Sequence, residues 1–161
     1  MRLAIVIVVG LVIVASLVVC WFVWNAPFGA CVRGDLGENY QKTISALDGT
    51  VDLGLKLSTT LVGFGAALLI GIKDSVRMTP TLRVLVLVST LLFAQSALYG
   101  VWWRLGVAES WLNECLNLVI EPRLKARYLA HFYFFLVGLV SLGLVVIAAS
   151  WPRTENENTT G

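Results

Sequence analysis

Two of the three cysteines lie in hydrophilic segments of the chain, where a disulfide bond is the chemistry open to them. Cys31 belongs to the segment 25–52 and Cys115 to the segment 104–127, whereas Cys20 falls inside a long apolar run. If both segments face one oxidising compartment, a thiol in each is what a disulfide between them requires. We therefore predict a Cys31–Cys115 bond, and the alternative is two unrelated free thiols.

His131 is the single histidine of the chain and a poor metal ligand by itself. Structural zinc takes four nitrogen or sulfur ligands, and a bis-histidine haem needs a second histidine. The sequence holds no C-x-x-C, H-E-x-x-H, G-x-x-x-x-G-K-[ST] or G-x-S-x-G motif. We accordingly expect no catalytic residue, no metal and no cofactor. A membrane redox enzyme that uses Cys31, Cys115 and His131 is the last of the alternatives.

Polar side chains at or within apolar runs are the other residues that could carry a function. Gln95 lies near the middle of its run, so its amide should face another helix and hydrogen-bond to it, a contact worth roughly 0.6–1.7 kcal/mol. Lys56 follows Asp52 by four residues, so the two charges would pair at the membrane surface on a continuous helix. Lys56, Gln95 and His131 together support an alternative function as a small transporter or channel component.

Four apolar runs carry or border these residues, and each predicts a transmembrane helix. The chain is 58% hydrophobic and 14% charged, whereas an average soluble domain is about 25% charged. A helix of about 20 apolar residues crosses the hydrocarbon core of a bilayer. The second run is the weakest, because Lys56 interrupts it, and a re-entrant segment is the alternative there. We expect an all-α membrane protein with one domain over 1–161, a four-helix bundle with spans at about 3–24, 53–72, 83–103 and 128–151.

The segment between the third and fourth spans shows a pattern of its own. Apolar residues over 107–120 recur at helical spacing, with acids and amides between them, and Pro122 follows. This pattern predicts a short amphipathic helix in the headgroup region of the membrane. In the first hydrophilic segment, only one or two helical turns are expected, over 40–47. The polar tail 153–161 is expected to be disordered.

The second run also carries a motif for helix packing. Its small residues recur at intervals of four, so they share one face of a helix. Small residues at this spacing let two helix backbones approach closely in lipid. The neighbour could be a helix of the same chain or of another chain. The predicted packing face consists of Thr59, Gly63, Ala67 and Gly71.

The charges give conflicting indications of orientation. Basic residues are slightly more numerous on the side of the segments 25–52 and 104–127, which favours the cytoplasm for that side. The short segment 73–83 nevertheless concentrates three basic residues beside one acid, which favours the opposite orientation. The predicted disulfide also requires that the segments 25–52 and 104–127 lie outside the cytoplasm. We therefore expect both termini in the cytoplasm, in a plasma membrane or a bacterial inner membrane.

These observations favour a structural role over a catalytic one. The net charge of +2 is too small to indicate binding to nucleic acid. The expected partners are membrane lipids and either other membrane protein subunits or a second copy of the chain. The sequence predicts a non-catalytic multi-pass membrane protein, an accessory or scaffold subunit that acts through helix–helix and lipid contacts.

Overall fold

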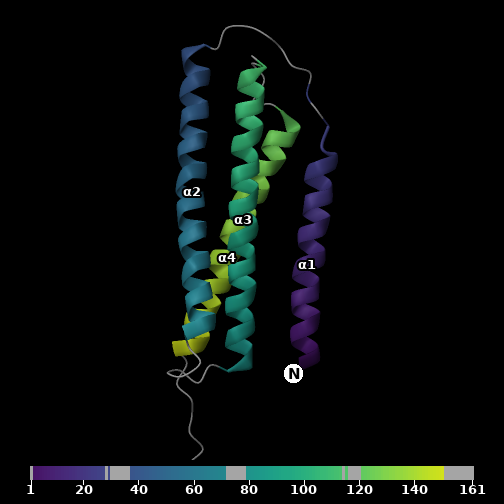
Figure 1. The fold of residues 1–161 in the computed structure, drawn as a ribbon, viewed down its shortest axis with the longest axis vertical. Helices are drawn as coiled ribbons and strands as arrows, with labels where there is room; N and C mark the ends of the chain where they lie inside the picture. The colour runs from purple at the N-terminus through teal and green to yellow at the C-terminus, as the bar shows by residue number, and fades with distance from the viewer. Residues whose placement is uncertain are drawn as a thin grey trace, which may run out of the picture.

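Four α-helices make up the part of the chain that the structure, a computed structural model, describes: residues 2–27, 29, 37–71, 79–113, 115 and 121–150. They are α1 (Arg2–Asn25), α2 (Glu38–Gly71), α3 (Pro80–Leu112) and α4 (Pro122–Ser150). Figure 1 shows the helices running lengthwise beside one another, with α1 and α2 on opposite sides of α3. Helix α3 packs extensively against α2 and α4, whereas α1 contacts α3 and α4 only lightly. The predicted all-helical fold is confirmed.

Three of these helices are long and apolar enough to cross a membrane, by length and composition: those within Tyr40–Ile70, Pro80–Leu112 and Pro122–Ser150. Helix α1 has 24 residues, and the part of it whose side chains are described without a gap is the apolar stretch Val9–Asn25. The fourth predicted span, at 3–24, therefore stays a prediction.

Large apolar side chains cover the outside of the bundle. Phe22 on α1, Ile70 on α2 and Val140 on α4 are 69%, 79% and 65% exposed. Soluble monomers rarely expose contiguous apolar surface of this extent, because water penalises it. The outer surface therefore supports a location in a membrane.

Helices α2 and α3 are longer than the predicted spans at 53–72 and 83–103. They have 34 and 33 residues, which at 1.5 Å per residue is about 50 Å, against a hydrocarbon core of about 30 Å. The prediction of only one or two helical turns over 40–47 therefore underestimated the extent of the helix, because α2 begins at Glu38 and continues without interruption.

The predicted separate amphipathic helix over 107–120 is not supported. Residues up to Leu112 continue α3, which ends there with Asn113 as its C-cap, and residues 114 and 116–120 lie outside the described residues. No proline separates Trp103 from Leu112, so nothing stops the helix there. Within the described part of this stretch, Val107 packs against the core cluster that includes Trp103, whereas Trp111 and Leu112 are 55% and 86% exposed.

The parts of α2 and α3 that continue beyond the predicted spans meet the start of α4, and the three form a small hydrophobic core. Its buried members are Ile44, Val51, Trp103 and Leu124. On its outside, Arg104 of α3 binds two carboxylates of α2, with Nε 3.0 Å from Asp48 and Nη2 2.9 Å from Asp52. We call this part of the bundle, residues 38–52, 104–112 and 122–127, the charged end.

Candidate functional site

His131 lies where α2, α3 and α4 meet, and it is 3% exposed. Its Nδ1 is 2.7 Å from the carbonyl oxygen of Ser96 on α3, and because a carbonyl only accepts, Nδ1 carries the proton in this contact. The hydroxyl of Ser96 donates to the carbonyl oxygen of His131, at 3.0 Å, and accepts from Ser58 of α2, at 3.2 Å. These polar groups therefore connect three helices.

Glycines make room for the imidazole ring. A Cβ atom at Gly54 of α2 would clash with Nε2 of His131, and one at Gly100 of α3 would lie 3.0 Å from its Nδ1. The two glycines thus let α2 and α3 approach the ring from different directions. This role was not predicted from the sequence, although Val51, Ser58 and Gly65 recur every seven residues and all are buried. That spacing is the signal that could have identified the inner face of α2.

A second polar contact joins α3 and α4 further along the bundle. The hydroxyl of Ser89 donates to that of Ser141 at 2.8 Å, and both side chains are buried. Nearby close approaches again depend on glycine, because a Cβ at Gly138 would lie 2.9 Å from the ring of Phe93. The interior of the α2–α3–α4 unit is therefore held by hydroxyl contacts and by glycines.

The predicted packing face of α2 does not pack within the chain. Thr59, Gly63 and Ala67 are exposed, and a Cβ placed at Gly63 would meet nothing within 4 Å. The hydroxyl of Thr59 bonds back to its own helix, at 2.8 Å from the carbonyl oxygen of Leu55. Gly71 ends α2, and its surroundings lie outside what the structure describes. The face points outward, toward lipid or another molecule.

The three residues of the transport alternative lie in separate parts of the molecule. Lys56 forms the predicted ion pair with Asp52, at 2.6 Å, and its side chain is 74% exposed. Gln95 lines a small cavity of about 220 Å³ between α1 and α3, and within the described residues its amide makes no hydrogen bond. The expected bond across the bundle is made instead by its neighbour Ser96, to His131. Lys56, Gln95 and His131 therefore do not line a common path.

The cysteines give a partial answer to the disulfide prediction. Cys20 is free, whereas Cys115 carries no free thiol. Cys31 lies outside the described residues, so the predicted Cys31–Cys115 bond stays a prediction. Within the described part of the chain, no three His, Cys, Asp or Glu side chains are placed to hold a metal ion.

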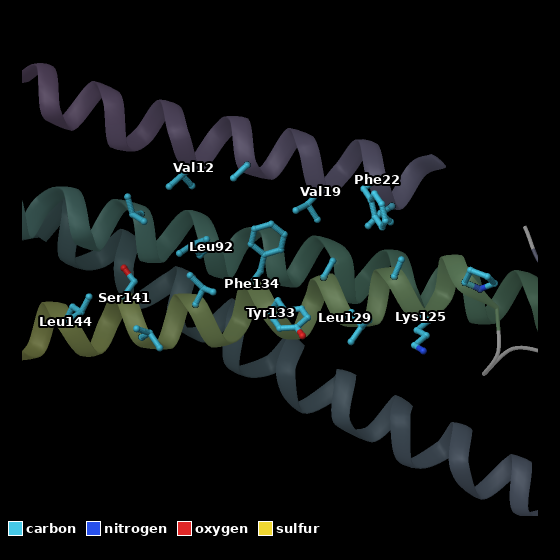
Figure 2. Close-up of a pocket in the computed structure, with 18 residues that line it drawn as sticks. Val12, Val19, Phe22, Leu92, Lys125, Leu129, Tyr133, Phe134, Ser141 and Leu144 are labelled. Atoms are coloured by element: carbon cyan, nitrogen blue, oxygen red, sulfur yellow. The ribbon is translucent and has the colours of Figure 1, made fainter. Parts of the chain in front are cut away.

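A large groove runs between α1 and α4, with α3 as its floor, and has a volume of about 810 Å³. Figure 2 shows its lining side chains, which project from the three helices into the space beside α1. Nearly all of them are aliphatic or aromatic; the polar ones are Lys125 at the charged end, the Tyr133 hydroxyl and Ser141. We call this feature the α1–α4 groove. Its apolar members include Val12, Val19, Phe22, Leu92, Leu129 and Val137.

Two arginines of the first turns of α4, Arg123 and Arg127, lie at the charged end but do not line the groove. Arg127 stacks on Trp102, with Cζ 4.4 Å from the ring centre, and its Nη1 donates to the Trp102 carbonyl at 3.3 Å. Arg123 donates to the carbonyl oxygen of Ala26, just beyond the end of α1, at 2.5 Å. Burial raises the pKa of the neighbouring Glu121 above its usual range, although Arg127 and Arg123 oppose the shift. Each guanidinium group therefore binds a carbonyl oxygen, although Nε of Arg127 is buried without an acceptor among the described residues.

Comparisons with protein-family models, curated proteins and solved structures gave no match to this chain.

Proposed function

We propose that this is a non-catalytic multi-pass membrane protein, an accessory or scaffold subunit that acts through contacts with other helices and with lipids. The observation that carries the proposal is that the buried polar side chains hydrogen-bond to one another between helices. Ser58, Ser96 and His131 bond one another, and Ser89 bonds Ser141. Polar groups inside a bilayer need internal partners, so these groups serve to hold the bundle together. The outer surfaces are then the surfaces available for partners.

The outer face of α2 at Thr59, Gly63 and Ala67 is the proposed contact for a transmembrane helix of another protein or of a second copy. It is exposed in the single chain. Because Gly63 has no side chain, a second helix can approach the backbone of α2 closely there, and dispersion contacts then provide the attraction.

The experiment compares two glycines of α2 that both face open space, Gly63 and Gly49. The protein is extracted from its own membrane in polymer-bounded nanodiscs, and the mass of the assembly is measured. Wild type and Gly49→Leu should form an assembly heavier than the 17.6 kDa chain, and Gly63→Leu should be monomeric. Mass spectrometry of the assembly distinguishes a second copy from another subunit. A monomeric wild type, or an unchanged assembly in Gly63→Leu, would contradict the proposal.

The proposed topology has four spans, both termini in the cytoplasm, and Cys31 bonded to Cys115 on the oxidising side. Two observations support the bond. The chain has three cysteines, of which Cys20 is free and Cys115 is not. The contact between Arg123 and Ala26 also brings the end of α1 beside the start of α4. Cys31 follows Ala26 by few residues, and Cys115 precedes Arg123 by few residues. Because each residue spans up to about 3.5 Å, the chain is long enough for the two cysteines to meet.

The topology and the bond are tested separately. A digest made without reductant should contain a linked Cys31–Cys115 peptide, whereas alkylation of both thiols in fresh unreduced membranes would exclude the bond. Reporter fusions after Lys42, Lys73 and Arg153 should report the outside for Lys42 and the cytoplasm for the other two. The same side for Lys42 and Lys73 would exclude the second span.

A further inference from the structure

We propose that the α1–α4 groove binds one phospholipid with an anionic headgroup, its acyl chains lying along the groove and its phosphate at Lys125. The proposal concerns a different surface from the outer face of α2 and does not depend on it. It rests on the apolar lining of the groove, on the side of the groove that is open to the bilayer, on the light contacts of α1 and on the charge of Lys125.

The lining of the groove matches an acyl chain. Along most of its length, the groove is bounded by aliphatic and aromatic side chains from α1, α3 and α4. Inside it, the hydroxyl of Ser141 already accepts a hydrogen bond from Ser89 at 2.8 Å. A polar ligand would find few partners on these walls, whereas a hydrocarbon chain needs none.

The groove is open sideways to the bilayer. Val137 and Val140 of α4 line it and are 52% and 65% exposed, and Phe22 on the opposite rim is 69% exposed. Figure 2 shows these rims belonging to two helices, α1 and α4, with α3 between them. An apolar space of about 810 Å³ that borders hydrocarbon is filled by it, because an empty groove would forfeit dispersion contacts along its walls.

Contacts between α1 and the other helices do not fill the groove. Helix α1 contacts α3 and α4 only lightly. Its best-packed residue, Val23, lies in its last turn and contacts Tyr99 and Ala130 near the charged end. Further from that end, Val12 and Val19 line the groove. An acyl chain between α1 and α4 would therefore supply packing that the two helices do not give each other.

Lys125 supplies the charge complementarity that selects an anionic headgroup. It lines the charged end of the groove, is exposed, and makes no ion pair within the described residues. In the proposed topology it stands one turn before the span 128–151, which would put it at the depth of lipid phosphates. Arg123 and Arg127, each two residues from it on α4, instead direct their guanidinium groups to the carbonyl oxygens of Ala26 and Trp102. Lys125 is thus the cation left for a phosphate.

Native mass spectrometry of the full chain in detergent tests the proposal, with dioleoylphosphatidylglycerol and dioleoylphosphatidylcholine added at equal concentration. Wild type should retain one phosphatidylglycerol per chain, with at least tenfold lower occupancy by phosphatidylcholine. Lys125→Gln should bring the two occupancies close to equal. Lys42→Gln is the matched control, because Lys42 lies at the same end of the bundle and pairs with Glu38 at 2.7 Å. It should retain the wild-type preference.

Filling the groove should remove both lipids. Val137→Trp is the first variant and Val140→Trp the second, and either is scored only if its circular dichroism matches wild type. The control is Val146→Trp on α4, which is 62% exposed and does not line the groove. Equal binding of both lipids by wild type, or full retention of phosphatidylglycerol by both folded groove variants, would overturn the proposal. So would a lipid-free dimer cross-linked through Val140→Cys, which would identify a helix as the occupant.

Failure of this proposal and failure of the proposed function are distinguishable. Gly63→Leu alters the outer face of α2 and should bind lipid as wild type does. Val137→Trp alters the groove and should leave the mass of the nanodisc assembly unchanged.

Discussion

The bundle holds its helices together in two different ways. Around His131, the backbones of α2, α3 and α4 approach closely, because Gly54 and Gly100 present no side chain to the ring. On the other side, α1 meets α3 and α4 through larger side chains such as Val23, and the hydroxyl of Ser16 bonds back to Val12 of its own helix at 2.8 Å. Apolar burial attracts helices little in lipid, so close approach and hydrogen bonds decide which helices associate firmly. The α2–α3–α4 unit has both, whereas the described part of α1 contacts α3 and α4 only lightly.

The largest effect should come from removing the ring at the centre of the firm unit. His131→Ala leaves a cavity between three helices and takes the bonding partner from Ser96, so the free energy of unfolding should fall by about 3 kcal/mol. The measurement is unfolding by sodium dodecyl sulfate in mixed micelles, followed by circular dichroism. The neighbouring Phe132, 41% exposed toward lipid, provides the control Phe132→Ala, which should change stability much less. Equal losses would mean that His131 is not a structural connection.

Close approach is tested next by adding a single methyl group. Gly54→Ala places a Cβ against Nε2 of His131, and overpacking of this kind costs about 1–3 kcal/mol. Gly49→Ala and Gly63→Ala add the same methyl on the outside of the same helix, where nothing lies within 4 Å. Both should unfold at the wild-type detergent concentration, or slightly above it, because alanine favours helix. Destabilisation by Gly49→Ala as large as that by Gly54→Ala would contradict the assignment of the inner face of α2.

The outcome for α2 shows what a single sequence can and cannot reveal in a membrane protein. The apolar runs predicted the helices, and the four-residue spacing predicted the ion pair of Asp52 with Lys56, which the structure contains. The inner face of α2 was not predicted, because lipid-facing and protein-facing positions are both apolar. Small residues at intervals of four pointed to Gly63, whereas the buried positions in the described part of α2 are Ile44, Val51, Ser58 and Gly65.

Two other features depended on tertiary placement. Gln95 has the larger polar group, but Ser96 is the residue that faces His131, and a shift of one position turns a helical side chain by about 100°. The α1–α4 groove has no local pattern, since it arises from how far α1 stands from α4. Its polar end at Lys125 was visible only as one of several basic residues in the segment 104–127.

A smaller effect on stability should distinguish serine hydroxyls that hydrogen-bond between two helices from a serine hydroxyl that bonds only within its own helix. Ser89 bonds Ser141 across α3 and α4, whereas Ser16 bonds within α1. A double-mutant cycle of Ser89→Ala and Ser141→Ala should give a coupling of roughly 0.6 kcal/mol, typical of hydrogen bonds between membrane helices. Ser16→Ala should leave the free energy of unfolding nearly unchanged. Zero coupling between Ser89 and Ser141 would remove the second polar contact from the firm unit.

The smallest expected effect is a dependence on pH at Glu121, beside the groove. Burial raises the pKa of this carboxyl above its ordinary 4.5, so in this range the folded state binds the proton more readily than the unfolded state. The resulting stabilisation is fully present below pH 4.5 and is lost as the pH rises through the raised value. Because Arg127 and Arg123 oppose the shift and solvent screens it, the change should stay below about 1 kcal/mol.

Thermal unfolding in detergent between pH 4 and pH 8 measures this dependence as the difference between wild type and Glu121→Gln. The difference cancels the other carboxylates, including Asp48 and Asp52, whose ion pairs with Arg104 are present in both proteins. Glu121→Gln should gain stability relative to wild type as the pH rises, because the amide carries no charge to be desolvated. Glu38→Gln, altering an exposed carboxylate on α2, should show no such gain. A constant difference between wild type and Glu121→Gln across the whole range would mean that the carboxyl is solvated, and that the charged end beside the groove is more open to water than the packing around Arg127 implies.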